Sequence, residues 1–148
     1  MEKKYESLKL ENQLCFPLYA ASRKVVGEYT PHLKKLGITY TQYLVFMVLW
    51  ENDDLTVGDI CRKLYLDNGT LSPVLKKMEG KGFIKRVRSE KDERIVKILL
   101  TEEGRQMREK ATEIPDLISS CINITKEEAM VLYSALYKIL GKEADNDL

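Results

Sequence analysis

The sequence predicts a mainly α-helical fold with a small β-hairpin, and three observations support this class. Two short amphipathic segments with helical spacing follow one another over residues 56–64 and 67–81. A hairpin with a charged tip follows over residues 83–100, and longer helical segments flank these elements on both sides. Two short helices joined by a tight link and followed by a hairpin form the pattern of a winged helix-turn-helix. We expect a single domain, because 148 residues suffice for one core.

The first helix is predicted over about residues 8–28. Apolar residues recur there at three- and four-residue spacing, at Leu10, Leu14, Leu18, Ala21 and Val25. Pro17 requires that the helix either bends or begins close to that residue. A turn at Thr30 and Pro31 should lead to a brief helix that Gly37 ends, because glycine is typical after a helix C-terminus.

The central helices are predicted from capping residues and apolar faces. Thr39 or Thr41 can cap a helix whose apolar run, residues 43–50, places it in the core. Thr56 can cap a short helix that ends near Leu64.

Residues 67–70 open the second short helix, which Lys81 and Gly82 end. Its expected buried stripe is Leu71, Val74, Leu75 and Met78. Two strands follow, over residues 83–88 and 95–100.

The C-terminal part is again helical. Thr101 can cap one helix, Pro115 interrupts or bends it, and residues 125–128 form a capping box for a last helix to Leu140. Long amphipathic helices at both ends of the chain indicate an obligate dimer.

The net charge of +1 hides an uneven distribution. Residues 62–97 contain eleven Lys or Arg against five Asp or Glu, whereas residues 101–148 contain six against ten. Phosphates attract cations, so a basic middle segment indicates a nucleic-acid-binding lobe. On charge alone, a solvated surface explains the pattern equally well.

Composition argues against several classes of protein. No apolar run is long enough to cross a bilayer, and the first residues lack a secretory signal, so we expect a cytoplasmic protein with no membrane partner. Cys15, Cys61 and Cys121 are far apart and odd in number, unlike a disulfide framework or a metal cluster. His32 is the only histidine, which excludes a His-based triad and argues against zinc. We expect no metal, no cofactor and no catalytic residue.

Three motifs resemble the signature of the MarR family of transcription regulators. They are DNGTLSP at residues 67–73, DER at 92–94 and LTEEG at 100–104. The stretch NQLCFPLYAAS at residues 12–22 further resembles the OhrR-type sensors of organic hydroperoxides. The resemblance covers nearly the whole chain up to about Pro115.

The resemblance implies a homodimer with one winged lobe in each subunit. The lobe should span about residues 39–100, and the dimerisation helices about 8–37 and 101–141. It further implies that the dimer represses promoters carrying inverted repeats, so its expected partner is double-stranded DNA.

The helix that begins at Asn68 should enter the major groove by its N-terminal end. The expected DNA-binding residues of this helix are Asn68, Thr70, Ser72, Lys76 and Lys77. Such side chains can read base edges or grip phosphates, and the free amides of a first helical turn also favour a phosphate. A surface helix merely capped by Asp67 is the alternative, but it does not explain the adjacent basic hairpin.

The hairpin supplies the second part of the predicted DNA contact. Arg94 can reach a narrow minor groove, with Asp92 holding its orientation through a charge-assisted hydrogen bond. Arg86, Arg88 and Lys91 would lie along the DNA backbone. A solvated charged turn is the alternative for each of them.

Cys15 is the predicted redox sensor. Tyr19 lies one helical turn further along the same face, and a phenol that hydrogen-bonds a thiolate favours it. A thiolate attacks the O–O bond of a peroxide and becomes a sulfenic acid. The OhrR-type resemblance implies that Tyr29 and Tyr40 reach this sulfur across the dimer. A small buried hydrophobe is the alternative reading of Cys15.

The resemblance leaves two ways to complete the oxidation. Cys121 stands about where some OhrR-type regulators have a second cysteine, which condenses with the oxidised sensor of the other subunit. Other members use a small external thiol. Cys61 lies among apolar residues and is expected in the core without a role.

Two other functions stay open at this stage. A regulator of the same fold could sense a small phenolic ligand between its lobes, with Cys15 incidental. A thiol peroxidase fits less well, because no Thr or Arg is arranged beside Cys15 and an enzyme has no need of a basic wing.

Overall fold

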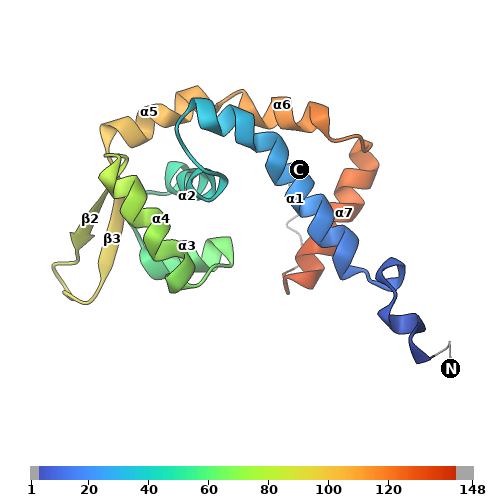
Figure 1. Cartoon of the computed structure of the whole chain (residues 1–148). Helices are drawn as coiled ribbons and strands as arrows, with labels where there is room; N and C mark the ends of the chain where they lie inside the picture. Colours follow the sequence, from blue (N-terminus) through green and yellow to red (C-terminus); the bar gives the residue numbers. More distant parts are fainter. Residues whose placement is uncertain (1–3, 143–148) are drawn as a thin grey trace.

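The structure is a computed structural model that describes residues 4–142, and it confirms the predicted fold class (Figure 1). The elements in chain order are η2 (Glu6–Leu8), η3 (Leu10–Asn12), α1 (Cys15–Lys35), α2 (Tyr40–Glu51), β1 (Leu55–Thr56), α3 (Val57–Leu64), α4 (Asn68–Gly80), β2 (Ile84–Arg88), β3 (Val96–Leu100), α5 (Glu102–Ala111), α6 (Ile114–Cys121) and α7 (Lys126–Ile139). Figure 1 shows a lobe built from α2, α3, α4 and the strands. Helices α5 and α6 connect this lobe to α7, and α1 extends away from the lobe on the same side as α7.

The first helix differs from its prediction at both ends. Helix α1 begins at Cys15, and Pro17 lies in its first turn, where the missing amide hydrogen costs no helical hydrogen bond. Pro31 lies inside the same helix, so the turn predicted there is wrong. Leu33 is buried in the core, and its packing outweighs the one hydrogen bond lost at Pro31. Gly37 follows the helix with a φ of +70°, as predicted.

Side-chain caps begin the later helices where the sequence predicts them. The capping residues are Thr39, Thr56, Asp67, Thr101 and Thr125. Three of these caps form reciprocal capping boxes, in which the third helical residue also accepts the amide hydrogen of the cap. Pro115 lies in the first turn of α6, after α5 has ended, so the predicted interruption is confirmed.

The predicted hairpin is present and gains a third strand. Strands β2 and β3 are antiparallel, with Ile84 opposite Leu100 and Arg88 opposite Val96. Strand β1 pairs with the other edge of β3, which gives the order β1-β3-β2. Two residues are too few to show an alternating pattern, so β1 could not be predicted from periodicity.

The core lies around α2, as its apolar run predicts. Phe46 of α2, Leu75 of α4 and Ile98 of β3 are fully buried. The indole Nε1 of Trp50 donates a hydrogen bond of 3.0 Å to the carbonyl of Gly104, which holds α2 against the first turn of α5.

Large apolar side chains are exposed at both ends of the chain. In the described part, all such side chains except Tyr65, Val87 and Ile95 lie within residues 5–19 or 117–140. Helix α7 contains no buried residue. An apolar surface of this extent indicates a site of association with another molecule. No helix within residues 4–142 has the length and apolarity of a membrane span.

Candidate nucleic-acid interface and thiol site

The N-terminal half of α4 turns its polar face outward. All five residues predicted to bind DNA on this helix are exposed, namely Asn68, Thr70, Ser72, Lys76 and Lys77. Leu71 and Leu75 anchor the opposite face in the core. The carboxylate of Asp67 accepts the amide hydrogen of Thr70 at 2.7 Å, and this bond lowers the pKa of Asp67. The helix therefore begins at a fixed residue, with short polar side chains on its accessible side.

Asn68 has a side-chain partner that the sequence did not reveal. The Sγ of Cys61, in α3, donates a hydrogen bond of 3.2 Å to Oδ1 of Asn68. Cys61 is buried, as predicted, and its burial raises the pKa of the thiol, with a further contribution from the nearby charge of Asp67. The thiol therefore remains a donor at neutral pH.

Arg94 stands near the tip of the wing, which comprises β2, β3 and the segment that joins them. Its side chain is 93% exposed. Asp92 Oδ1 accepts the backbone amide hydrogen of Arg94 at 3.0 Å and lies 3.4 Å from its Nε, so the contact predicted between the two residues is present. Arg88 and Lys91 are also exposed. The wing thus presents an oriented guanidinium and two further cations.

Arg86 is placed differently from the other basic residues of the wing. Its Nε lies 3.1 Å from the carboxylate of Glu79 in α4, and its guanidinium also donates to the carbonyl of Ser72 at 3.5 Å. These contacts brace β2 against α4. Arg86 therefore has a structural partner within the chain, which periodicity could not predict.

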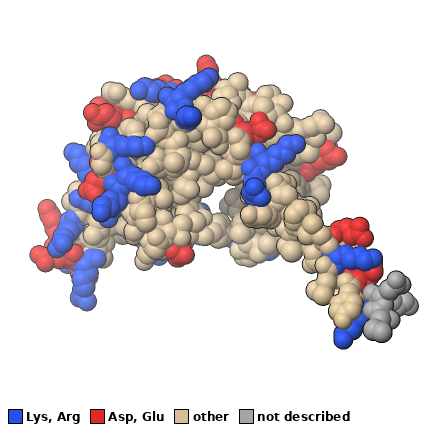
Figure 2. Space-filling model, in the orientation of Figure 1, with Lys and Arg blue, Asp and Glu red and all other residues tan. Residues whose placement is uncertain are grey.

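The polar end of α4 and the wing meet around one hollow. Its volume is about 500 Å³, and its lining includes Thr56, Gly58, Asn68, Ser72 and Arg94. Figure 2 shows Lys and Arg side chains gathered over the wing side of the molecule. A hollow that brings Asn68 and Ser72 of α4 together with Arg94 of the wing, beside other exposed basic residues, has features of a nucleic-acid interface. Thr56 and Gly58 were not predicted in it, although the cap at Thr56 already placed a helix N-terminus there.

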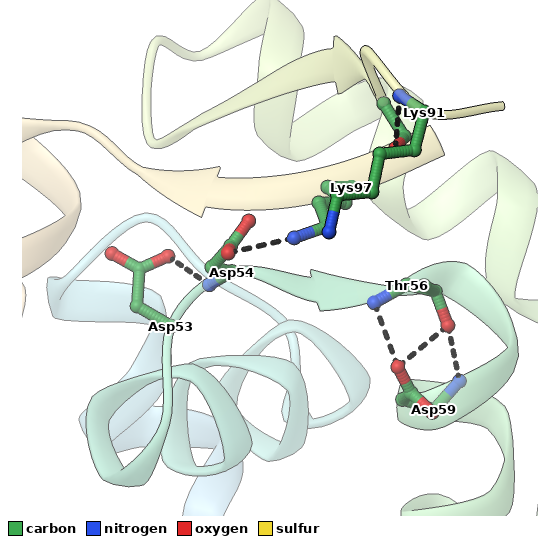
Figure 3. A network of polar contacts seen from close by, with 7 residues as sticks. Asp53, Asp54, Thr56, Asp59, Lys91 and Lys97 are labelled. Atoms are coloured by element: carbon green, nitrogen blue, oxygen red, sulfur yellow. Dashed lines mark hydrogen bonds and ion pairs between the residues drawn. The ribbon is translucent and has the colours of Figure 1, made fainter. Parts of the chain in front are cut away.

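Two other basic residues of this region are held by the turn before β1. Lys97 Nζ lies 2.8 Å from Asp54 Oδ2, as Figure 3 shows, and Arg105 lies 3.1 Å from Asp53 Oδ2. Asp53 also accepts the amide hydrogen of Leu100 at 3.0 Å. Lys97 and Arg105 therefore fix the turn to the sheet and to α5, and they are not counted among the candidate DNA contacts.

Cys15 is exposed as the first residue of α1. Tyr19, one turn further, is 60% exposed, and its ring lies 5.4 Å from the guanidinium of Arg23. Within residues 4–142, no hydrogen bond joins the sulfur of Cys15 to Tyr19. The support that the sequence predicted from Tyr19 is thus absent from the isolated subunit.

Tyr29 and Tyr40 lie together, as the resemblance implies, but far from Cys15 of the same chain. Their ring centroids are 5.0 Å apart, and Tyr43 lies 5.8 Å from Tyr29. Burial raises the pKa of Tyr29 and of Tyr40, so both phenols remain hydrogen-bond donors. Continuous helix separates Tyr29 from Cys15, a distance of about 21 Å at 1.5 Å per residue. The tyrosines therefore cannot contact Cys15 of their own subunit.

Cys121 is the last residue of α6 and is exposed. Its Sγ donates a hydrogen bond of 3.3 Å to the carbonyl of Leu117. Figure 1 places the end of α6 well apart from the start of α1, and both thiols are free. In the described part of the chain, no group of His, Cys, Asp or Glu is arranged to hold a metal ion.

The chain is similar to known proteins both in sequence and in structure. A family profile described as transcriptional regulator SarA/Rot matches residues 28–111. The organic hydroperoxide resistance transcriptional regulator of Bacillus subtilis is 52% identical over 140 residues, which are 95% of each chain. Reduced AbfR of Staphylococcus epidermidis bound to DNA is 40% identical, with a TM-score of 0.77 over 95% of this chain and 98% of that one.

A disulfide form of AbfR also has 40% sequence identity to this chain, and the match covers 94% of this chain and 98% of that one. Its TM-score is lower, at 0.65. The conformation described here is therefore nearer to the reduced, DNA-bound form of AbfR than to its disulfide form.

Proposed function

Because this chain belongs to the MarR-type winged-helix transcriptional regulators, in the group of the organic hydroperoxide regulators and the SarA/Rot family, we propose that it is a redox-switched repressor. It acts as a homodimer in the cytoplasm, binds an inverted-repeat operator and releases it when Cys15 is oxidised. A relative named for organic hydroperoxide resistance favours an oxidant over a phenolic ligand as the signal. We expect no catalytic turnover of peroxide.

The redox part of the proposal rests on the separation of about 21 Å between Cys15 and Tyr29 along one continuous helix. Because of this separation, any contact between the two residues must join different subunits. A sensing thiol benefits from donors that stabilise its thiolate, and the buried phenols of Tyr29 and Tyr40 are such donors. In a twofold dimer, helix α1 of one subunit can pack antiparallel to α1 of the other subunit. Each tyrosine pair would then lie near the sulfur of the other subunit.

The apolar surface of residues 5–19 and 117–140 supports this dimer, because it offers a self-complementary contact at the ends of the chain that form α1 and α7. The winged lobes remain free on the far side. Two lobes related by a twofold axis match two half-sites spaced by about one helical turn, ~10 base pairs.

The proposed DNA contacts divide into base reading and backbone binding. Asn68, Thr70 and Ser72 read base edges from the first turns of α4, and Arg94 enters the minor groove. The phosphate contacts are Lys76, Lys77, Arg88 and Lys91. Arg86 supports the wing through its ion pair with Glu79 and is not proposed as a DNA contact.

Oxidation of Cys15 begins when its thiolate sulfur attacks the terminal oxygen of the hydroperoxide. An S–O bond forms, the O–O bond breaks, and the alkoxide leaves and takes up a proton to become an alcohol. The sulfur loses two electrons and the peroxide gains them. The sulfenic acid then condenses with a second thiol, which gives a disulfide and water. Cys121 of the other subunit or a small external thiol supplies that second sulfur.

Fluorescence anisotropy with the DNA upstream of the protein's own gene tests the proposal. The reduced dimer should bind this DNA, cumene hydroperoxide should release it, and dithiothreitol should restore binding. The variant Cys15→Ser should bind equally well and resist the peroxide. Release of Cys15→Ser by the same dose contradicts the role of Cys15, and failure of the reduced parent to bind contradicts the assignment as a regulator of that promoter.

A further inference from the structure

The contact between Cys61 and Asn68 links the two helices of the helix-turn-helix at the residue that begins the recognition helix. Cys61 is 8% exposed and lies in the core, whereas Asn68 is exposed and lines the hollow beside Ser72 and Arg94. The sulfur lies 3.2 Å from Oδ1 of Asn68. A buried group in the core therefore contacts a side chain at the candidate DNA surface.

The chemistry of the contact determines which end of the amide faces the core. A thiol is a donor, and burial raises the pKa of Cys61, so the proton stays on sulfur. In the structure the amide oxygen faces the sulfur and accepts this proton. Within residues 4–142, Nδ2 of Asn68 has no hydrogen-bond partner. The amide therefore offers two N–H donors away from its contact with Cys61.

We propose that Cys61 is a positioning residue for sequence recognition, which holds the Asn68 amide with Nδ2 presented to the DNA. This inference rests on the proposed function. An amide presented in this way favours base edges that carry acceptors, such as O6 and N7 of guanine or O4 of thymine. Without the thiol, the amide can rotate by half a turn and present its oxygen to donors such as N4 of cytosine. Cys61 thus sets the preference for one base pair without touching DNA.

The experiment begins with duplexes selected from a random pool by the reduced parent protein. The affinity of each variant is then measured for the selected duplex and for copies with one base pair changed. The variants are Cys61→Ala, Cys61→Val, Cys61→Ser, Asn68→Ala and the double variant Cys61→Ala with Asn68→Ala. Urea unfolding checks that each variant is folded, and the two donor-free replacements, alanine and valine, guard against a defect in packing.

A base contact of this kind gives discrimination on the order of tenfold, so Cys61→Ala and Cys61→Val should lose about three- to tenfold discrimination at one base pair. It should be the base pair at which Asn68→Ala also loses discrimination. Cys61→Ser should retain part of the preference, because a hydroxyl is still a donor. The double variant should resemble Asn68→Ala alone. The dependence of affinity on salt should not change, because the contact carries no net charge.

Two results would overturn the inference. One is an unchanged base preference in both Cys61→Ala and Cys61→Val. The other is an equal loss of affinity for every duplex, which indicates a packing role only. Failure of the parent to enrich any sequence from the pool is a different outcome, because it contradicts the proposed function as well as the inference that depends on it.

Discussion

The carbonyl oxygen of Phe83 stands where a side chain on Gly104 would begin, since a Cβ on Gly104 would lie 2.2 Å from that oxygen. The same carbonyl accepts the amide hydrogen of Thr101 at 3.1 Å, and the carbonyl of Gly104 accepts the indole hydrogen of Trp50. Helix α5 thus packs directly on the start of the hairpin and on α2. This junction joins the winged lobe to the C-terminal helices.

We expect Gly104→Ala to lower the free energy of unfolding by roughly 1–3 kcal/mol or more, because the obstructing atom belongs to the backbone and cannot rotate away. Gly80→Ala is the matched control. A Cβ on Gly80 meets nothing within 4 Å, and alanine favours a helix, so this change should be neutral or stabilising. Urea unfolding at one protein concentration measures both. Equal stability of Gly104→Ala and the parent would mean that α5 can shift freely at this junction.

The exposure of Arg94 leads to a prediction about DNA affinity. We expect Arg94→Ala to weaken operator binding by about 1–3 kcal/mol, because a minor-groove guanidinium reads both charge and groove width. Lys77→Ala, on the exposed side of α4, should cost less and mainly flatten the dependence on salt. Titrations at several salt concentrations separate the two effects. Equal affinity of Arg94→Ala and the parent would remove the wing tip from the interface.

Local signals predicted most of the fold, because they depend on residues close in sequence. The caps at Thr56 and Thr125 each bond to an amide three residues away, so their positions followed from the sequence alone, whereas the sequence allowed Thr39 or Thr41 and the structure selects Thr39. Pro31 was misread, because the burial of Leu33 that keeps α1 helical comes from tertiary packing. Strand β1 was missed because it has only two residues.

The exposure of the predicted DNA-binding residues of α4 and the local contact between Asp92 and Arg94 followed from the sequence, but the contacts between separate elements did not. Nothing in the spacing of Cys61 and Asn68 indicates that sulfur and amide meet, because the link between α3 and α4 decides this. Likewise, the pairing of Arg86 with Glu79 depends on how β2 lies against α4. The contact of Tyr29 with Tyr40 also depends on how α2 packs against α1, which spacing along the chain does not specify.

The tyrosine cluster provides a kinetic prediction. We expect Tyr29→Phe and Tyr40→Phe to slow the oxidation of Cys15 by cumene hydroperoxide, because each removes a donor that favours the thiolate. Tyr65→Phe, in the winged lobe between α3 and α4, makes the same chemical change outside the proposed dimer contact and serves as the control. The rate of loss of free thiol in single-turnover reactions measures the effect. Unchanged rates in both Tyr29→Phe and Tyr40→Phe would contradict contact across the dimer.

The apolar ends of the chain predict an obligate dimer at micromolar concentration. Val131 of α7 is 71% exposed in the subunit, so an acidic residue there costs little in a monomer but would be buried in a dimer formed through this surface. We expect Val131→Asp to shift sedimentation toward the monomer. Lys110→Asp, on exposed α5, should leave the dimer intact. A parent protein that sediments as a monomer would contradict the proposed assembly.

The last prediction concerns the second thiol. A disulfide requires the two Cα atoms to approach to about 5.5–6 Å, whereas Cys121 at the end of α6 and Cys15 at the start of α1 are both free here. If Cys121 resolves the sulfenic acid, and the reduced dimer holds it farther than this from Cys15 of the other subunit, α6 or α7 must move before the bond can close. Such a movement within the dimer would rotate the winged lobes out of register with successive major grooves. The lower similarity of this structure to the disulfide form of AbfR, by TM-score, is consistent with a change of this kind.

We therefore expect a covalent dimer on non-reducing electrophoresis after treatment with cumene hydroperoxide in the absence of other thiols. Both Cys15→Ser and Cys121→Ser should abolish it, because the bond joins one residue of each kind across the subunits. Ser120→Ala, beside Cys121, is the control for local disturbance of α6 and should still form the dimer. If Cys121→Ser leaves the oxidised product and DNA release unchanged, the second sulfur comes from a small external thiol. Mass spectrometry after oxidation with added cysteine would then find that thiol attached to Cys15.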